Sequence, residues 1–112
     1  MSLITTHVLD TSTGKPATGV KAELFFLDNT LWKMIAEGIT NEDGRITDLL
    51  NERDSLQFGL YKLKFETGDF FFKNGADTFY PYAEITFKIN DDRHYHIPLL
   101  ISPFGFTTYR GS

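Results

Sequence analysis

Three histidines are the residues of this 112-residue chain best suited to chemistry: His7, and the pair His94 and His96 near the other end. The ordinary pKa of imidazole lies close to neutrality, so each is a candidate for taking a proton from water. A histidine can equally be a strand residue hydrogen-bonded to a neighbour, and for His7 that is the simpler explanation. The residue types therefore indicate three candidates for a general base, and they do not decide which of the three takes the proton.

The His-x-His spacing, together with a distant third histidine, would also suit a three-histidine zinc site. The third ligand would have to come from His7, and a nearby Arg45 would oppose a cation. The chain has no cysteine, which excludes a thiolate metal site and a disulfide framework. We therefore expect no metal site.

Arg45 follows Asn-Glu-Asp-Gly at residues 41–44, the clearest turn signal in the sequence. Asp-Gly supplies the positive φ that tight turns need, so this turn sets the position of Arg45. An arginine after such a turn is usually a solvated surface charge. The functional alternative is a fork-shaped donor for a planar, oxygen-rich anion.

The last residues include Tyr109, Arg110 and Ser112. Chain ends fray unless something holds them, so side chains of these types directly after a strand pair indicate a functional tail. Arg110 could bind an anion or pair with acidic neighbours as a structural anchor, and Tyr109 could belong to the core. Ser112 offers its hydroxyl and a terminal carboxylate, and no Gly-x-Ser-x-Gly sequence marks a nucleophilic serine.

Residues 94–101 are predicted to form the strand that positions two of the histidines, because side chains alternate between the faces of a strand. One face is apolar: Tyr95, Ile97, Leu99 and Ile101. The other face is mixed: His94, His96, Pro98 and Leu100. The apolar face suits a core and the mixed face a cleft or a partner surface. Pro98 cannot donate a ladder hydrogen bond, so we expect the strand to be broken there or to lie near a sheet edge.

The rest of the chain is predicted to be short strands separated by turn signals, with one short helix. The expected strands cover residues 3–10, 20–28, 31–40, 46–50, 59–66, 82–90, 94–101 and 104–110. The expected helix covers residues 67–74, with Thr67 or Asp69 near its N-cap and Gly75 just past its end. Loops are expected at 11–19 and 51–55. This pattern indicates an all-β sandwich, and the length indicates one domain spanning residues 1–112.

Composition and charge narrow the classes of partner. The net charge of −4 argues against a nucleic-acid partner, which would favour a basic surface. No secretory signal is recognisable at the amino terminus, and no apolar run approaches the ~20 residues needed to cross a bilayer. We expect a soluble, cytoplasmic protein with no membrane partner.

Three motifs in order carry a resemblance to a known family. The run HYHIPLLISPFGFTTYRGS at 94–112 closely resembles the carboxyl-terminal signature of the transthyretin-like family, in its 5-hydroxyisourate hydrolase branch. THVLDTSTGKPATGV at 6–20 resembles the opening segment of that family, and EDGR at 42–45 matches a third motif. Together the motifs span nearly the whole chain. The resemblance implies a transthyretin-type two-sheet antiparallel β-sandwich of seven to eight strands with one short helix.

The resemblance also implies an activity, the ring-opening hydrolysis of 5-hydroxyisourate in urate catabolism, without metal or cofactor. The catalytic residues that it implies in this sequence are His7, Arg45, His96 and Ser112. The substrate-binding residues that it implies are His7, Arg45, Tyr109 and Arg110. The role of His94 stays open. It further implies a homotetramer with sites at subunit interfaces.

Two other kinds of protein are alternatives. A non-catalytic carrier on the same fold, as in transthyretin, would lack the histidine set and the terminal Tyr-Arg-Gly-Ser, both of which this chain has. A structural β-sandwich module for adhesion or assembly would not need three histidines and an arginine that match one site. The sequence therefore favours the hydrolase.

Overall fold

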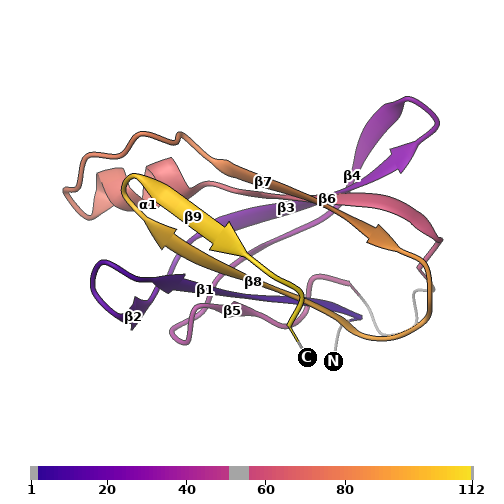
Figure 1. The fold of residues 1–112 in the computed structure, drawn as a ribbon, viewed down its shortest axis with the longest axis horizontal. Helices are drawn as coiled ribbons and strands as arrows, with labels where there is room; N and C mark the ends of the chain where they lie inside the picture. The colour runs from indigo at the N-terminus through magenta and orange to yellow at the C-terminus, as the bar shows by residue number, and fades with distance from the viewer. Residues whose placement is uncertain (1–2, 51–55, 112) are drawn as a thin grey trace.

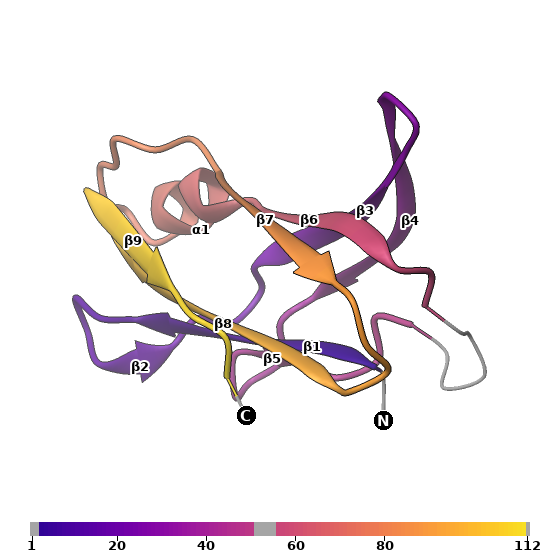
Figure 2. The ribbon, with the colours of Figure 1, turned by 45° about the vertical axis from the view of Figure 1, so that its right-hand side comes forward.

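A computed structural model of the protein describes residues 3–50 and 56–111, and these fold into two packed β-sheets with one short helix (Figures 1 and 2). The expected loop at 51–55 and the expected role of Ser112 lie outside the described residues. The first sheet comprises β1 (Ile4–Asp10), β2 (Lys15–Pro16), β5 (Arg45–Ile46), β8 (Tyr95–Ser102) and β9 (Gly105–Thr108). The second sheet comprises β3 (Lys21–Asp28), β4 (Leu31–Ile39), β6 (Gly59–Phe65) and β7 (Ala83–Ile89). The expected all-β sandwich is confirmed.

The core lies between the two sheets and is built by strand alternation. In β6, Tyr61, Leu63 and Phe65 are buried while the lysines between them are half-buried. In β8, the predicted apolar face is buried in full: Tyr95, Ile97, Leu99 and Ile101. Burying these side chains is the main driving force for packing the sheets. The opposite face of β8 is therefore turned away from the core.

The predicted helix is confirmed as α1 (Thr67–Lys73), which buries Thr67 and Phe71. Gly75 follows its end with a φ of 72°, as a residue past a helix terminus commonly does. Thr67 and Asp69 both lie in the first turn, near the N-cap as expected. The capping position itself belongs to Glu66, whose side chain makes no capping hydrogen bond.

One strand pair departs from the antiparallel arrangement. β1 and β8 run parallel over seven residue pairs, from Ile4 opposite Tyr95 to Asp10 opposite Ile101. Parallel neighbours need a long connection between them. Here the intervening chain forms the whole second sheet and α1, so the crossover is supplied by the sandwich itself.

Pro98 does not sit at a sheet edge, and β8 is not broken there, so that expectation is wrong. β8 lies between β1 and β9 and continues through Pro98. The missing amide is accommodated on the β9 side, where the ladder stops at the pair Leu99 and Thr108. Pairing then returns as an isolated bridge between His96 and Gly111.

Two short segments share the outer edge of β1. Residues Lys15–Pro16, in the segment expected to be loop, pair with the end of β1, and Arg45–Ile46 pair with His7 and Thr6. The expected strand at 46–50 is therefore wrong in extent: pairing ends at Ile46, and Leu49 is buried in the core. As a result, Arg45 and not Ile46 begins the strand.

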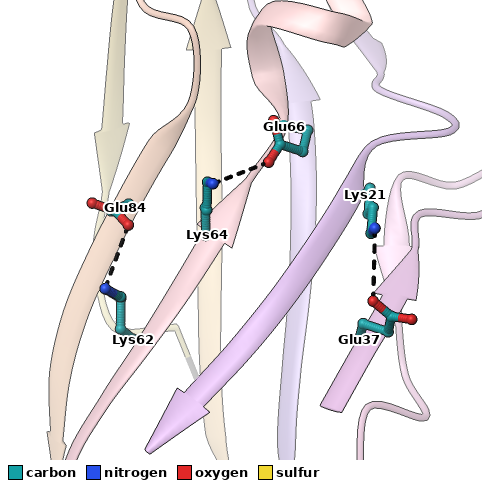
Figure 3. Close-up of polar contacts among 6 residues, drawn as sticks. All are labelled: Lys21, Glu37, Lys62, Lys64, Glu66 and Glu84. Atoms are coloured by element: carbon teal, nitrogen blue, oxygen red, sulfur yellow. Dashed lines mark ion pairs between the residues drawn. The ribbon is translucent and has the colours of Figure 1, made fainter. Parts of the chain in front are cut away.

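The outer face of the second sheet is lined by ion pairs at its surface. Figure 3 shows Lys62 with Glu84 across β6 and β7, Lys64 with Glu66, and Lys21 with Glu37 across β3 and β4. The exposed pair Lys21–Glu37 contributes about 0–1 kcal/mol to stability. In the described part of the chain, no helix is long and apolar enough to cross a membrane.

Candidate active site

The register of the first sheet brings three predicted site residues onto adjacent strands. Arg45 of β5 lies opposite His7 of β1, and Thr5, two residues before His7, lies opposite His96 of β8. The side chains between them on β1, Ile4, Thr6 and Val8, are fully buried. Alternation therefore turns Thr5, His7 and His96 to the outer face of the sheet, as the sequence predicts for His96.

The turn at 41–44 fixes the start of β5. The side-chain Oδ1 of Asn41 accepts hydrogen bonds from the backbone amides of Asp43 at 2.9 Å and Arg45 at 3.0 Å. Gly44 has a φ of 74°, and a Cβ there would collide with the carbonyl oxygen of Val8. Glycine is therefore required at this position, and it lets the turn pack against β1 with Arg45 beside His7.

The pKa of His7 is lowered from its ordinary value of 6.5. Burial is the largest cause, because a desolvated imidazole resists protonation, and the positive charge of Arg45 is the second. A hydrogen bond to the backbone of Asp43, and the charge of that residue, act in the opposite direction with less effect. His7 is thus held neutral at physiological pH.

His96 is perturbed in the same direction. Its pKa is lowered by burial first, then by the charges of Arg45, His94 and His7, against a smaller opposing hydrogen bond to the Thr5 backbone. The positive charge of Arg45 therefore lowers the pKa of both histidines. Two neutral imidazoles beside a guanidinium can accept a proton and stabilise negative charge on the same ligand.

A single hydroxyl connects two of the histidines. Thr5 Oγ1 lies 2.8 Å from Nδ1 of His96 and 3.0 Å from Nε2 of His94. The two imidazole rings are near-parallel, with centroids 6.3 Å apart. The sequence alone does not single out Thr5, although its place two residues before His7 on a predicted strand puts it on the same face.

The predicted tail residues take different positions. The guanidinium of Arg110 lies 4.2 Å from the ring centroid of Tyr95, whose side chain belongs to the core face of β8. Tyr109 and Arg110 both line a cavity of about 250 Å³ that also touches β7. Among the described residues, the structure thus brings Arg110 to Tyr95, and Arg110 is not among the groups that act on His7 or His96.

The hydroxyl of Tyr95, whose ring Arg110 overlies, donates a hydrogen bond to Asp91 at 2.9 Å. That hydrogen bond is the largest cause of a lowered pKa for the Asp91 carboxyl, to which Arg110 adds a smaller electrostatic effect. This arrangement matches the anchoring alternative for Arg110. Its role at the substrate, and that of Tyr109, stay predictions.

Among the described residues, no group of three histidine, cysteine or acidic side chains is placed to hold a metal ion.

The fold and the site together define a two-sheet β-sandwich protein with a histidine–arginine site on the outer face of one sheet. The model of the HIUase/Transthyretin family matches residues 4–111, and the chain belongs to this family.

Relatives and solved structures agree with that assignment. The chain is 44% identical to a probable 5-hydroxyisourate hydrolase of Schizosaccharomyces pombe, over 97% of this chain and 90% of that one. It is 42% identical to a 5-hydroxyisourate hydrolase of Halalkalibacterium halodurans, over 97% of each. The structure of Klebsiella pneumoniae 5-hydroxyisourate hydrolase superposes with a TM-score of 0.86 at 40% identity, covering 97% of this chain and 98% of that one. Sea bream transthyretin in complex with thyroxine superposes with a TM-score of 0.92 at 30% identity, covering 98% and 95%.

Proposed function

We propose that this protein is a 5-hydroxyisourate hydrolase, a cyclic amide hydrolase that opens the ring of 5-hydroxyisourate to give 2-oxo-4-hydroxy-4-carboxy-5-ureidoimidazoline. The observation that carries the proposal is the coupling of His7 and His96 to one arginine, Arg45, on one sheet face. The family membership and the curated relatives support the same activity.

In the proposed mechanism, a neutral histidine of the pair His7 and His96 takes a proton from water, and the resulting hydroxide adds to a ring carbonyl of the substrate. Arg45 orients the planar ring and stabilises the negative charge that develops on the carbonyl oxygen. The tetrahedral adduct then collapses by breaking the ring C–N bond, and the leaving nitrogen takes up the proton. Tyr109, Arg110 and Ser112 are proposed to complete the substrate site.

We propose that the working form is a homotetramer whose sites lie between subunits. The histidine face is an open sheet surface, on which His7 and His96 are half-buried and Arg45 is exposed. A second copy of the same face would enclose it and shield the reaction from bulk solvent, with symmetric contacts. We also propose a cytoplasmic location, which the absence of cysteine supports.

The direct test is to mix the protein with freshly prepared 5-hydroxyisourate and follow the ultraviolet absorbance as the ring opens. Accelerated decay that scales with protein concentration is expected, and exhaustive chelation should leave the rate unchanged. Saturable binding without accelerated decay would instead assign the chain to the carriers.

A further inference from the structure

We propose that Thr5 and His94 are positioning residues that hold His96 in the tautomer able to act as the general base. The inference rests on the proposed hydrolase activity for its catalytic part. Its structural part, the tautomer of His96, stands on the hydrogen-bond geometry of the Thr5 hydroxyl and can be measured without substrate.

The geometry allows few arrangements of protons. A threonine hydroxyl has one hydrogen to donate and can accept through its lone pairs. Thr5 is buried, with a residual exposure of 5%, and its Oγ1 is within hydrogen-bond distance of two imidazole nitrogens. For both contacts to be hydrogen bonds, at least one of the two nitrogens must donate its own hydrogen to the hydroxyl, because the hydroxyl hydrogen can point to only one of them. The tautomers of His94 and His96 are therefore linked through Thr5.

One arrangement that this linkage allows leaves His96 in the productive tautomer, and the proposal assigns it to the protein when His94 is neutral. His94 is exposed, so its Nδ1 can keep a hydrogen bonded to water while Nε2 accepts from the Thr5 hydroxyl. The hydroxyl oxygen then accepts from Nδ1–H of His96, and Nε2 of His96 is left with a free lone pair.

The ring of His96 is also fixed in direction. Its Nδ1 side faces Thr5 on β1, and its Cδ2 side faces Gly111, where a Cβ would lie only 2.6 Å away. Nε2 is consequently among the ring atoms that point away from the sheet. The charged or titratable groups acting on His96 are Arg45 on β5, His7 on β1 and His94 beside it, and none of them competes for Nδ1 in the described contacts.

Thr5→Val removes the hydroxyl at nearly constant shape, and Thr5→Ser restores it. His94→Phe keeps a ring but removes the acceptor nitrogen. Thr6→Val is the matched control, because Thr6 is the next residue, points into the core and donates to the carbonyl of Ile97. The measurement is nuclear magnetic resonance of ¹⁵N- and ¹³C-labelled histidine in the intact protein, at a pH where His96 is neutral.

We expect the Nδ1–H form of His96 in the wild type and in the Thr6→Val and Thr5→Ser proteins. A mixture of tautomers is expected in Thr5→Val and in His94→Phe. Turnover by Thr5→Val should fall roughly tenfold in kcat with little change in KM, because ring position and tautomer matter for proton transfer more than for binding.

An Nε2–H form of His96 in the wild type would overturn the proposal, as would an unchanged tautomer in Thr5→Val. A shifted tautomer with unchanged kcat would overturn its catalytic part. If the wild type failed to hydrolyse 5-hydroxyisourate, the proposed function would fall and the resonance data would still decide the linkage.

Discussion

Gly111 lies directly against the ring of His96. Its amide donates a hydrogen bond to the His96 carbonyl at 2.8 Å, and a Cβ built on Gly111 would be 2.6 Å from Cδ2 of that ring and 3.1 Å from Cγ of Pro98. The rings of His96 and Pro98 therefore occupy the space that a side chain on residue 111 would need. The tail and the histidine form one packed unit, although the ladder between β8 and β9 has already stopped.

Gly111→Ala should displace the His96 ring and lower kcat, on the order of 10²-fold if the displacement approaches 1 Å. Steady-state kinetics with 5-hydroxyisourate measures the loss, and thermal unfolding checks the fold. Gly105→Ala is the matched control, because a Cβ there meets only Ser102 Oγ at 3.7 Å. Equal kcat in the two variants would show that the ring can move aside without consequence.

His7→Asn and His96→Asn should each lower kcat by roughly 10²-fold or more, the scale expected for loss of a general base. Both are half-buried on the outer face of the first sheet, so the core should be unaffected, which circular dichroism would verify. Near wild-type turnover in both variants would contradict the proposed mechanism.

Arg45→Lys should be nearly as damaging as Arg45→Ala, because a lysine cannot present two parallel donors to a planar anion. Values of kcat and KM for both variants test this, with Arg93→Lys, a charge in the turn before β8, as control. Full activity in Arg45→Lys would show that the forked geometry of the arginine side chain is not needed.

The pH dependence follows from the direction of the histidine shifts. The pKa values of His7 and His96 are lowered in the folded protein, so the unfolded chain binds more protons once the pH falls below about 6.5. Stability should therefore be complete above that pH and decrease as the pH falls through the folded-state values.

The acid limb of kcat/KM should likewise lie below pH 6.5, because the proposed general base is a neutral imidazole. Arg45→Ala should move this limb to higher pH, since Arg45 lowers both pKa values. A limb that stays in place would show that Arg45 does not contribute to the lowered pKa values.

Leu100→Asp should dissociate the proposed tetramer and abolish turnover together, while each sandwich stays folded. Leu100 lies on the outer face of β8, opposite Thr107 of β9. Light scattering and the ring-opening assay test this, and Leu60→Asp places the same charge on the other sheet, where Leu60 is 40% exposed. A folded monomer or dimer with full turnover would show that each subunit holds a complete site.

Local sequence patterns predicted most of the elements because their causes are local. Alternation identified the core face of β8, Asp43-Gly44 identified the turn before Arg45, and residues 67–74 were expected to be helical. These features depend on side-chain period and on the φ angles that particular residues favour.

The features that sequence did not predict depend on neighbours distant in the chain. The parallel pairing of β1 and β8, the two-residue strand at Lys15–Pro16 and the interior place of Pro98 are all set by which strand lies alongside. The hydrogen bond between Thr5 and His96 joins residues 91 positions apart, and no local sequence pattern predicts it. The position of Arg110 over Tyr95 follows from the path of the tail.

The parallel pairing of β1 with β8 has a consequence for folding kinetics. The contacts of β1 with β8 join residues about ninety positions apart, so they are among those with the largest loop-closure entropy and should form late. Until β8 docks, one edge of β1 offers unpaired amides and carbonyls to other chains. Aggregation during refolding should therefore compete with docking of β8, and the histidine–arginine site should be the last part of the molecule to become functional.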